Sequence, residues 1–285
     1  MIHSIRFAGS KFLNCTACLL LLVFQPFSFA SERLEPLRLL VVPQYQATEI
    51  NNSWGTVLKG LSEKGIPKIE LIFAKDISDF EAQFLAGKAD LIYCNPYHMV
   101  MAKKAQGYLP LLRDKKPLKG ILISANNRDG EVIEDLKSLE GKTILFPSPN
   151  AFGASLYMRA LLTKDMGINF TTKYVKTHPN VIRGVVRDEG QAGGMVAATY
   201  FAEADTLRDK TKVIYETPPA PPHPIAAHPR VDEATRELLT KAFIAFIQSN
   251  KEAGVSIQIP DPVRSNYAKD YQALERLGLE AFVAR

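Results

Sequence analysis

Hydrophobic and polar positions follow each other along the chain in blocks that predict strands and helices in turn. Short apolar runs are typical of buried strands, whereas apolar residues at helical spacing behind a capping residue predict helices. In the first part of the chain the predicted strands are 37–42, 69–74 and 89–93, and the predicted helices run from Asn52 or Ser53 to 65, from Ser78 to 87 and from 96 to 106. This alternation predicts a mostly parallel sheet with helices on both faces.

The same alternation begins again at residue 120. The predicted strands are 120–125, 143–146, 172–175, 212–215 and 225–227, and the predicted helices are 152–165, 180–186, 200–207, 233–248 and 265–277. The proline-rich stretch 217–224 cannot form a helix or a central strand, so it is expected to connect two units. The sequence therefore predicts a two-lobed α/β fold, with lobe one built from 31–123 and 225–285 and lobe two from 124–224. Two lobes joined by paired crossovers leave a cleft, which is the usual place for a ligand.

The first thirty residues have the three-part layout of a secretory signal. Arg6 and Lys11 form a basic start, an apolar run follows, and small residues stand at 28–30 where a signal peptidase cuts. The apolar run is shorter than the ~20 residues that a membrane-spanning helix needs. We therefore expect a signal peptide over 1–30, export to the periplasm and cleavage after Ala30, with an uncleaved anchor as the alternative. Cleavage would leave Cys94 as the one cysteine of the chain.

Composition and motifs exclude several classes of protein. Hydrophobic residues make up 46% and charged residues 23% of the chain, values typical of a globular protein with a core, and the net charge of +5 is too mild to indicate a nucleic-acid partner. The sequence has no nucleophile elbow, no zinc-protease helix, no phosphate-binding loop and no dinucleotide fingerprint. The histidines lack metal-ligand spacing, and His223 and His228 are expected to be solvated loop residues. No metal and no cofactor are expected.

A strand that ends in polar and aromatic residues is the first candidate site. Tyr93, Cys94 and Asn95 follow the predicted strand 89–93 and precede a helix. Side chains in this position lie at the carboxyl edge of the sheet, where open α/β folds bind ligands. The alternative is structural, with Tyr93 as an aromatic residue at the edge of the core and Asn95 as a helix cap.

The segment 146–155 is the second candidate. A strand, a tight turn at 148–150, small residues and a helix follow one another here. This order aims free backbone N–H groups and the positive end of the helix dipole into a cleft, which suits a small oxyanion. An ordinary connection between a strand and a helix is the alternative.

Three segments together resemble one protein family. They are G-K-A-D-L-I-Y-x-N at 87–95, P-x-P-N-x-x-G at 147–153, and V-K-T-H followed by V-I-x-G-V at 175–185. Their order and spacing are similar to those of the periplasmic phosphate/phosphite/phosphonate-binding proteins of ABC importers, over nearly all of the chain after residue 30. The resemblance implies a type II periplasmic-binding fold, hinge closure on the ligand and no catalysis. It implies ligand-binding positions at Tyr45, Tyr93, the 150–154 loop and His178.

The chain departs from that family in the loop and after the strand tyrosine. Ala151, Phe152 and Gly153 stand where the family has a run of hydroxyl side chains, so a dianion site is weakened unless backbone N–H groups compensate. Cys94 occupies a position that is commonly small or apolar. It is either a small hydrophobe in a packed wall or a thiol contact for a soft ligand such as arsenite, which arsenite-binding sensor proteins of the same broad family bind through cysteine.

We therefore expect a periplasmic solute-binding protein, not an enzyme, that captures a small oxyanion by lobe closure. It would hand the ligand to an ABC permease or present it to a membrane sensor histidine kinase, as a monomer. An arsenite-binding sensor component that uses Cys94 is the first alternative, and a secreted hydrolase is a weaker one. The candidate ligand-binding residues are Tyr45, Tyr93, Cys94, Asn95, Ser148, Asn150, Ala151, Phe152, Gly153, Ala154 and His178.

Overall fold

The computed structural model describes residues 1, 3, 35–126, 133 and 135–284. Residues 35–285 form one compact unit, separate from residues 1–34, and the description that follows concerns this unit. The expected signal peptide and its cleavage site lie outside the described residues. In the described part, no helix is both long enough and apolar enough to span a bilayer.

Lobe one is built on a mixed sheet with the strand order β11-β4-β10-β3-β1-β2. The strands are β1 (Leu37–Val41), β2 (Ile69–Ile72), β3 (Leu91–Tyr93), β4 (Leu109–Asp114), β10 (Pro224–Ala227) and β11 (Pro262–Arg264). β1 runs parallel to β2 and β3, whereas β10 pairs antiparallel with both β3 and β4. The strand that returns from lobe two therefore lies directly beside β3, the strand of the first candidate site.

Helices cover this sheet and bury its apolar side chains. They are α1 (Ala47–Ser62), α2 (Ile77–Leu85), α3 (Pro96–Gln106), α8 (Glu233–Ser249), α9 (Lys251–Ser256), α10 (Tyr267–Asp270), η4 (Gln272–Arg276) and η5 (Leu279–Phe282). α3 begins where Asn95 caps it: the Asn95 side chain accepts a hydrogen bond from the backbone N–H of His98, and proline stands in the first turn. The structural role that the sequence left open for Asn95 is thus confirmed.

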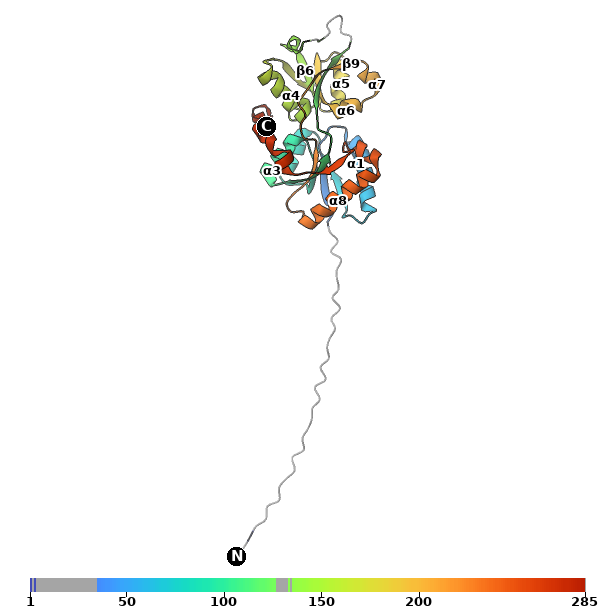
Figure 1. Ribbon diagram of the computed structural model, residues 1–285, viewed down its shortest axis with the longest axis vertical. Helices are drawn as coiled ribbons and strands as arrows, with labels where there is room; N and C mark the ends of the chain where they lie inside the picture. Colours follow the sequence, from blue (N-terminus) through green and yellow to red (C-terminus); the bar gives the residue numbers. More distant parts are fainter. Residues whose placement is uncertain (2, 4–34, 127–132, 134, 285) are drawn as a thin grey trace. The chain divides into compact units, whose positions relative to one another are not determined.

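Lobe two has a second mixed sheet with the order β7-β6-β8-β5-β9. Its elements are β5 (Gly120–Ala125), η1 (Leu136–Leu139), β6 (Thr143–Phe146), η2 (Phe152–Leu156), α4 (Tyr157–Ala160), η3 (Leu161–Asp165), β7 (Thr171–Tyr174), α5 (His178–Val186), β8 (Ala192–Val196), α6 (Ala197–Phe201), α7 (Asp205–Arg208) and β9 (Thr211–Glu216). α5 packs on the face of the sheet that carries Leu145, and α4 packs on the opposite face with Phe146 (Figure 1). Lobe two is therefore a sheet covered on both faces, as the alternating pattern predicts.

Two crossovers join the lobes side by side. Leu118 in one crossover and Ala220 in the other exchange both backbone hydrogen bonds, at 2.8 and 2.9 Å. β5 pairs only with β8 and β9 of lobe two, so the first crossover precedes Gly120. The sequence analysis divides the lobes between 123 and 124, which is inside this strand.

Some elements differ from the sequence predictions. α1 begins at Ala47 behind Gln46, which makes no side-chain cap, so no capping signal marks the true start. β4, β8, β11 and α9 are not predicted, and the predicted helix at 265–277 consists of α10 and η4. β8 contains Gly193 and Gly194, which weaken a strand pattern. A Cβ on Gly194 would lie 2.0 Å from the backbone carbonyl oxygen of Ala154 in η2, so glycine is required for the helix after β6 to pack on this strand.

Candidate functional site

A cavity of 450 Å³ lies between the lobes, at the carboxyl end of β3. It is lined by Tyr93 and His223 on the lobe-one side and by Val196, Ala197 and Phe201 of lobe two. A neighbouring cavity of 460 Å³ reaches Tyr45 and shares Asp114, Lys116, Ala198 and Gln258 with the first. The two cavities form one inter-lobe cleft, and Tyr45 and Tyr93 of the predicted ligand-binding residues line it.

The Tyr93 ring is held between two other rings. Its centroid lies 5.0 Å from that of Trp54 and 5.5 Å from that of His223, which is nearly parallel to it. Burial raises the pKa of Tyr93 well above its usual range, so the phenol keeps its proton and can donate it in a hydrogen bond. Tyr45 is half-buried, its hydroxyl accepts a hydrogen bond of 3.0 Å from the Gln258 amide, and burial is the main cause that raises its pKa to about 12.

The expectation that His223 is solvated is wrong. Pro218 and Pro219 of the proline-rich connector are exposed, but its last residues are packed inside and His223 is buried to 7% exposure against Tyr93. Burial, with smaller contributions from His98 and His178, lowers the pKa of His223 to about 3. The ring is therefore neutral at pH 7, and it brings aromatic surface but no charge to the cavity.

His178 starts α5 and is a neutral donor. Its Nδ1 lies 3.4 Å from the Val196 backbone N–H and 3.2 Å from the Thr199 hydroxyl, and an N–H can only donate, so the ring proton belongs on Nε2. Burial lowers the pKa of His178 to about 3. The backbone N–H of the same residue donates to the Gln44 carbonyl of lobe one at 3.4 Å. His178 therefore lies at the contact between the lobes, behind the Val196 wall of the cavity.

The 150–154 loop is buried at the start of the helix η2–α4–η3. Among the described residues, none accepts a hydrogen bond from the backbone N–H groups of Phe152, Gly153 or Ala154, because the first turn of a helix has no acceptors of its own. Phe152 is turned into the core and stacks on Tyr157, with centroids 5.5 Å apart. Ala151 and Ala154 are buried as well, and Ser148 is half-buried. The loop thus offers backbone donors where the family it resembles has hydroxyls.

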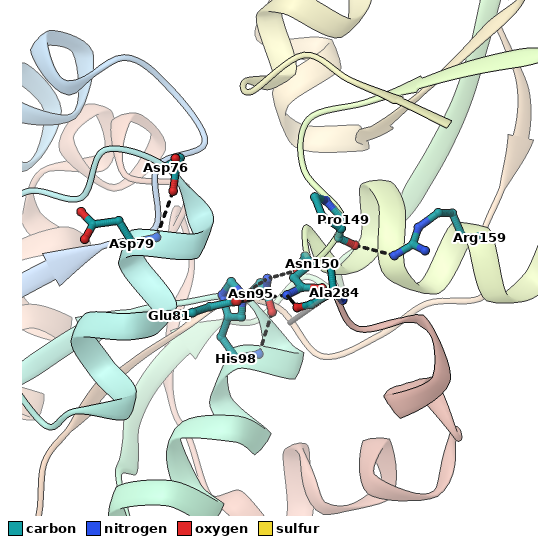
Figure 2. A network of polar contacts seen from close by, with 9 residues as sticks. All are labelled: Asp76, Asp79, Glu81, Asn95, His98, Pro149, Asn150, Arg159 and Ala284. Atoms are coloured by element: carbon teal, nitrogen blue, oxygen red, sulfur yellow. Dashed lines mark hydrogen bonds and ion pairs between the residues drawn. The ribbon is translucent and has the colours of Figure 1, made fainter. Parts of the chain in front are cut away.

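Asn150 connects the lobes through buried hydrogen bonds, and Figure 2 shows this network. Its carbonyl oxygen accepts from the Asn95 amide at 3.0 Å, and its own amide donates to the Glu81 carboxylate at 3.0 Å. The second oxygen of Glu81 lies 2.9 Å from His98 Nε2. Asn95, Glu81 and His98 all belong to lobe one. The two predicted segments, 93–95 and 150–154, therefore meet directly across the lobes.

The segment 278–284 crosses from lobe one onto lobe two. The Asn150 side chain donates to the Ala284 carbonyl and accepts from the Ala284 N–H, both at 2.9 Å. The Arg159 guanidinium donates to the carbonyls of Phe282 and Pro149, at 2.7 and 2.8 Å, which Figure 2 shows in part. Glu81, His98, Arg159 and this segment are missed by the sequence analysis, because no local pattern links residues so far apart in the chain.

Cys94 lies outside the cleft. Its side chain has no exposed surface, and it lines neither cleft cavity. Successive side chains of an extended segment point to opposite faces, so the thiol lies on the face away from Tyr93. Burial raises the pKa of the thiol well above its usual range. These features are those of a small core residue, and none of them favours Cys94 as an arsenite ligand. Among the described residues, no group of three metal-binding side chains is close enough to hold a metal ion.

Comparisons with known proteins follow the two lobes along the whole unit. The family described as "ABC transporter, phosphonate, periplasmic substrate-binding protein" matches residues 39–284. The phosphate-import protein PhnD of Mycolicibacterium smegmatis is 25% identical over 170 residues, which are 55% of this chain and 53% of that protein. The chain therefore matches about half the length of this curated relative.

Solved structures with the same fold include two bacterial binding proteins. One is PhnD1 of Prochlorococcus marinus in complex with methylphosphonate, with a TM-score of 0.74 and 16% identity over 86% of this chain and 97% of that one. Another is a binding protein component of a phosphonate ABC transporter from Pseudomonas aeruginosa, with a TM-score of 0.73 and 13% identity over 85% of each chain. At these identities the likeness concerns the fold, and the predicted two-lobed periplasmic-binding fold is confirmed.

Proposed function

The chain belongs to the family of periplasmic substrate-binding proteins of phosphonate ABC transporters, and on this premise we propose that it captures a small phosphorus oxyanion between its lobes. The family is one of binding proteins rather than enzymes, and its members work in the periplasm. The phosphorus oxyanions considered are phosphate, phosphite and phosphonates. The membership of this family is the premise. The identity of the ligand, its affinity and the partners of this chain are what we propose.

The observation that carries the proposal is a set of donors at the start of one helix. The N–H groups of Phe152, Gly153 and Ala154 have no acceptor in the described part of the chain, and the helix dipole adds partial positive charge there. A hydrogen bond to a charged group contributes about 1.5–3 kcal/mol, so several such bonds can hold an oxyanion without a hydroxyl side chain. His178 Nε2–H and the Tyr93 hydroxyl are two further neutral donors proposed for the same ligand.

Contacts between the lobes support capture by closure. The bond from Asn95 to the Asn150 carbonyl and the bond from His178 to the Gln44 carbonyl both join one lobe to the other. Opening the cleft breaks these bonds, and a ligand that touches both lobes favours the state in which they form. The candidate residues Asn95, Ser148, Asn150 and Ala151 are proposed to shape this contact rather than to supply charge.

Delivery and export follow from the same proposal. We infer an N-terminal signal cleaved after Ala30, a monomeric binding protein, and an ABC permease as the receiving partner. A membrane sensor histidine kinase is the alternative receiver. A neighbouring gene pair for a permease and its ATPase would support transport, and a neighbouring kinase gene would support sensing.

A thermal-shift screen followed by calorimetry tests the proposed function. The probes are phosphate, phosphite, methylphosphonate, sulfate, arsenate and arsenite. A ligand at 100 times its dissociation constant stabilises the folded state by about 2.7 kcal/mol, which is readily measured. At least one phosphorus oxyanion should give this shift, and a screen in which none of them does would overturn the proposal.

Substitution of a proposed donor sharpens this test. His178→Ala should weaken oxyanion binding at least tenfold, because one hydrogen bond to a charged group is lost. His228→Ala is the matched control, since His228 is half-buried, accepts a bond from the Arg230 backbone and packs edge-on against Tyr108 of lobe one, whereas His178 lies at the contact between the lobes. Equal affinities of the two variants and the original protein would remove His178 from the site.

A further inference from the structure

The Gln258 side chain holds the hydroxyl of Tyr45 in the inter-lobe cleft by a hydrogen bond of 3.0 Å. We propose that Gln258 is a positioning residue: its amide donates to the Tyr45 oxygen, so that the proton of this hydroxyl is directed into the cleft as a donor to the ligand. The inference rests on the proposed function, in which a phosphorus oxyanion is held between the lobes. The position of Gln258, the direction of its hydrogen bond and its backbone conformation support it.

Gln258 lies in the wall that the two cleft cavities share. It lines the cavity of 450 Å³ together with Tyr93 and the cavity of 460 Å³ together with Tyr45. Its side chain is half-buried, and Asp114 and Lys116 belong to the same shared wall. A ligand in contact with both tyrosines would therefore lie beside Gln258.

The direction of the hydrogen bond leaves the Tyr45 proton free. Gln258 Nε2 donates to Tyr45 Oη, and an amide N–H can only donate. A phenol has one proton, which it can then give to another acceptor. In the described part of the chain, no group accepts a hydrogen bond from this hydroxyl. Because the pKa of Tyr45 is raised to about 12, mainly by burial, the proton is present at neutral pH.

The backbone of Gln258 is left-handed, with a φ of 62°. It follows α9 in a Schellman motif, in which the Gln258 N–H donates to the Val255 carbonyl at 3.0 Å and the Ile259 N–H to the Gly254 carbonyl at 2.8 Å. Glycine is preferred at the position of Gln258 in this motif, because a side chain is strained in the left-handed region. A glutamine in this strained position, beside the cleft, indicates a role for its side chain.

The loop after Gln258 is anchored to the sheet of lobe one. The Asp114 carboxylate at the end of β4 accepts from the Asp261 N–H at 2.9 Å, and the Lys115 N–H donates to the Asp261 carbonyl at 2.8 Å. Asp114 is only 6% exposed. Tyr45, in contrast, precedes α1, whose start has no side-chain cap. An anchored loop thus fixes a hydroxyl that lies before an uncapped helix start.

The bond from Gln258 restricts the rotation of the Tyr45 hydroxyl. Without it, the hydroxyl can turn its proton toward water instead of the ligand. An ionised oxygen only accepts hydrogen bonds, so it gains from a proton that already points at it. Such preorganisation raises affinity because less freedom is lost on binding. The effect passes through Tyr45 and should vanish when the Tyr45 hydroxyl is absent.

A double-mutant cycle in calorimetry tests the inference on the purified protein, with phosphate, phosphite and methylphosphonate as probes. Gln258→Met keeps the length of the side chain and removes the amide. For the probe that binds most tightly, Gln258→Met should weaken binding about fivefold and Tyr45→Phe about tenfold, because a hydrogen bond to a charged group is weakened or lost. In the Tyr45→Phe background, Gln258→Met should change the affinity less than about twofold. The same loss in both backgrounds would assign Gln258 a structural role and overturn the inference.

Glycine at the same position separates binding from stability. Gln258→Gly relieves the positive φ, which offsets the greater freedom of glycine in the unfolded chain, so the melting temperature should stay within about 4 °C of the original. It should bind the probe as weakly as Gln258→Met does. Asp188→Gly is the matched control, because Asp188 also has a positive φ, of 63°, and lies in the exposed turn after α5, outside both cleft cavities. The control should bind as the original protein does, and equal affinities of the two glycine variants would overturn the inference.

The remaining outcomes distinguish this inference from the proposed function. Probe binding that is unchanged in Gln258→Met or in Tyr45→Phe would overturn the inference and leave the proposed function in place. Failure of the original protein to bind any of the three probes would overturn both proposals together.

Discussion

Replacing Asn150 tests the contact between the lobes at its most connected residue. Its side chain donates to the Glu81 carboxylate at 3.0 Å and to the Ala284 carbonyl at 2.9 Å, and it accepts from the Ala284 N–H at 2.9 Å. Asn150→Ala removes all three bonds but keeps the backbone carbonyl to which Asn95 donates. The variant should fold, with a lower free energy of unfolding.

The size of the loss depends on which groups water can reach. Ala284 is exposed, so water replaces its two bonds at little cost. Glu81 and Asn150 are only 8% and 3% exposed, so the carboxylate oxygen that faces Asn150 loses its partner inside the protein. A buried hydrogen bond to a charged group contributes about 1.5–3 kcal/mol, and we expect Asn150→Ala to cost about 2–3 kcal/mol. For a chain of this length that is a fall in melting temperature of about 4–12 °C.

Asn150→Asp lowers the free energy of unfolding by an amount that depends on pH. It places a second carboxylate against Glu81, and burial beside a like charge raises the pKa of the introduced group above its unfolded value of about 3.9. The extra destabilisation is then complete above that raised pKa and is relieved as the pH falls toward 3.9. The difference in stability between Asn150→Asp and Asn150→Ala should therefore shrink between pH 7 and about pH 4.

Urea denaturation across this pH range measures both variants. Asn169→Ala is the matched control, since Asn169 makes the same amide-to-carboxylate bond, to Glu140 at 3.2 Å, on the exposed surface. The control should change stability by less than about 0.5 kcal/mol. An Asn150→Ala variant as stable as this control would refute the reasoning, because the buried bond would then contribute nothing.

Three further predictions concern single residues. Cys94→Ser should lower the free energy of unfolding, measured by urea denaturation, by about 1–2 kcal/mol, because a hydroxyl would be buried without a partner. Cys94 of the original protein should react with a disulfide reagent only after unfolding, and fast reaction of the folded protein would contradict its burial. Burial raises the pKa of Asp90, but hydrogen bonds from Arg38 and Arg230 outweigh this and lower it. Asp90→Asn should thus cost about 1 kcal/mol at pH 7, after solvent screening of the half-exposed arginines, and progressively less as the pH falls below 3.8 through the lowered pKa; a constant cost would exclude the ion pairs. Ala151→Ser should raise phosphate affinity about tenfold in calorimetry by adding a hydroxyl at the helix start, and unchanged affinity would place the anion elsewhere.

Sequence patterns predict the fold where side chains report directly on local structure. Runs such as 37–42 are apolar because both faces of their strand are covered, and Asn95 followed by Pro96 marks a helix start that the structure confirms. The patterns fail where tertiary packing decides. β8 is glycine-rich because a helix lies against it, and α1 starts at a residue that makes no cap. Neither cause is visible within a short stretch of sequence.

The site was predictable only in part for the same reason. Tyr45 and Tyr93 line the cleft, and the segments 93–95 and 150–154 touch. The remaining contacts of Asn150 come from residues 81 and 284, which a local pattern cannot connect. The prediction for His223 is wrong because a proline-rich stretch is usually exposed, whereas the end of this one, at Pro222 and His223, is buried beside the cleft.

The ring contact between Trp54 and Tyr93 gives the cleft an optical reporter. Trp54 is the only tryptophan among the 285 residues, so all indole emission of the protein comes from this position. The indole is 2% exposed, and its centroid lies 5.0 Å from a ring that itself forms part of the cavity wall. A molecule that settles against Tyr93 changes the surroundings of one fluorophore. Ligand entry and lobe closure can thus be followed in real time, by stopped-flow mixing, in a protein that needs no label.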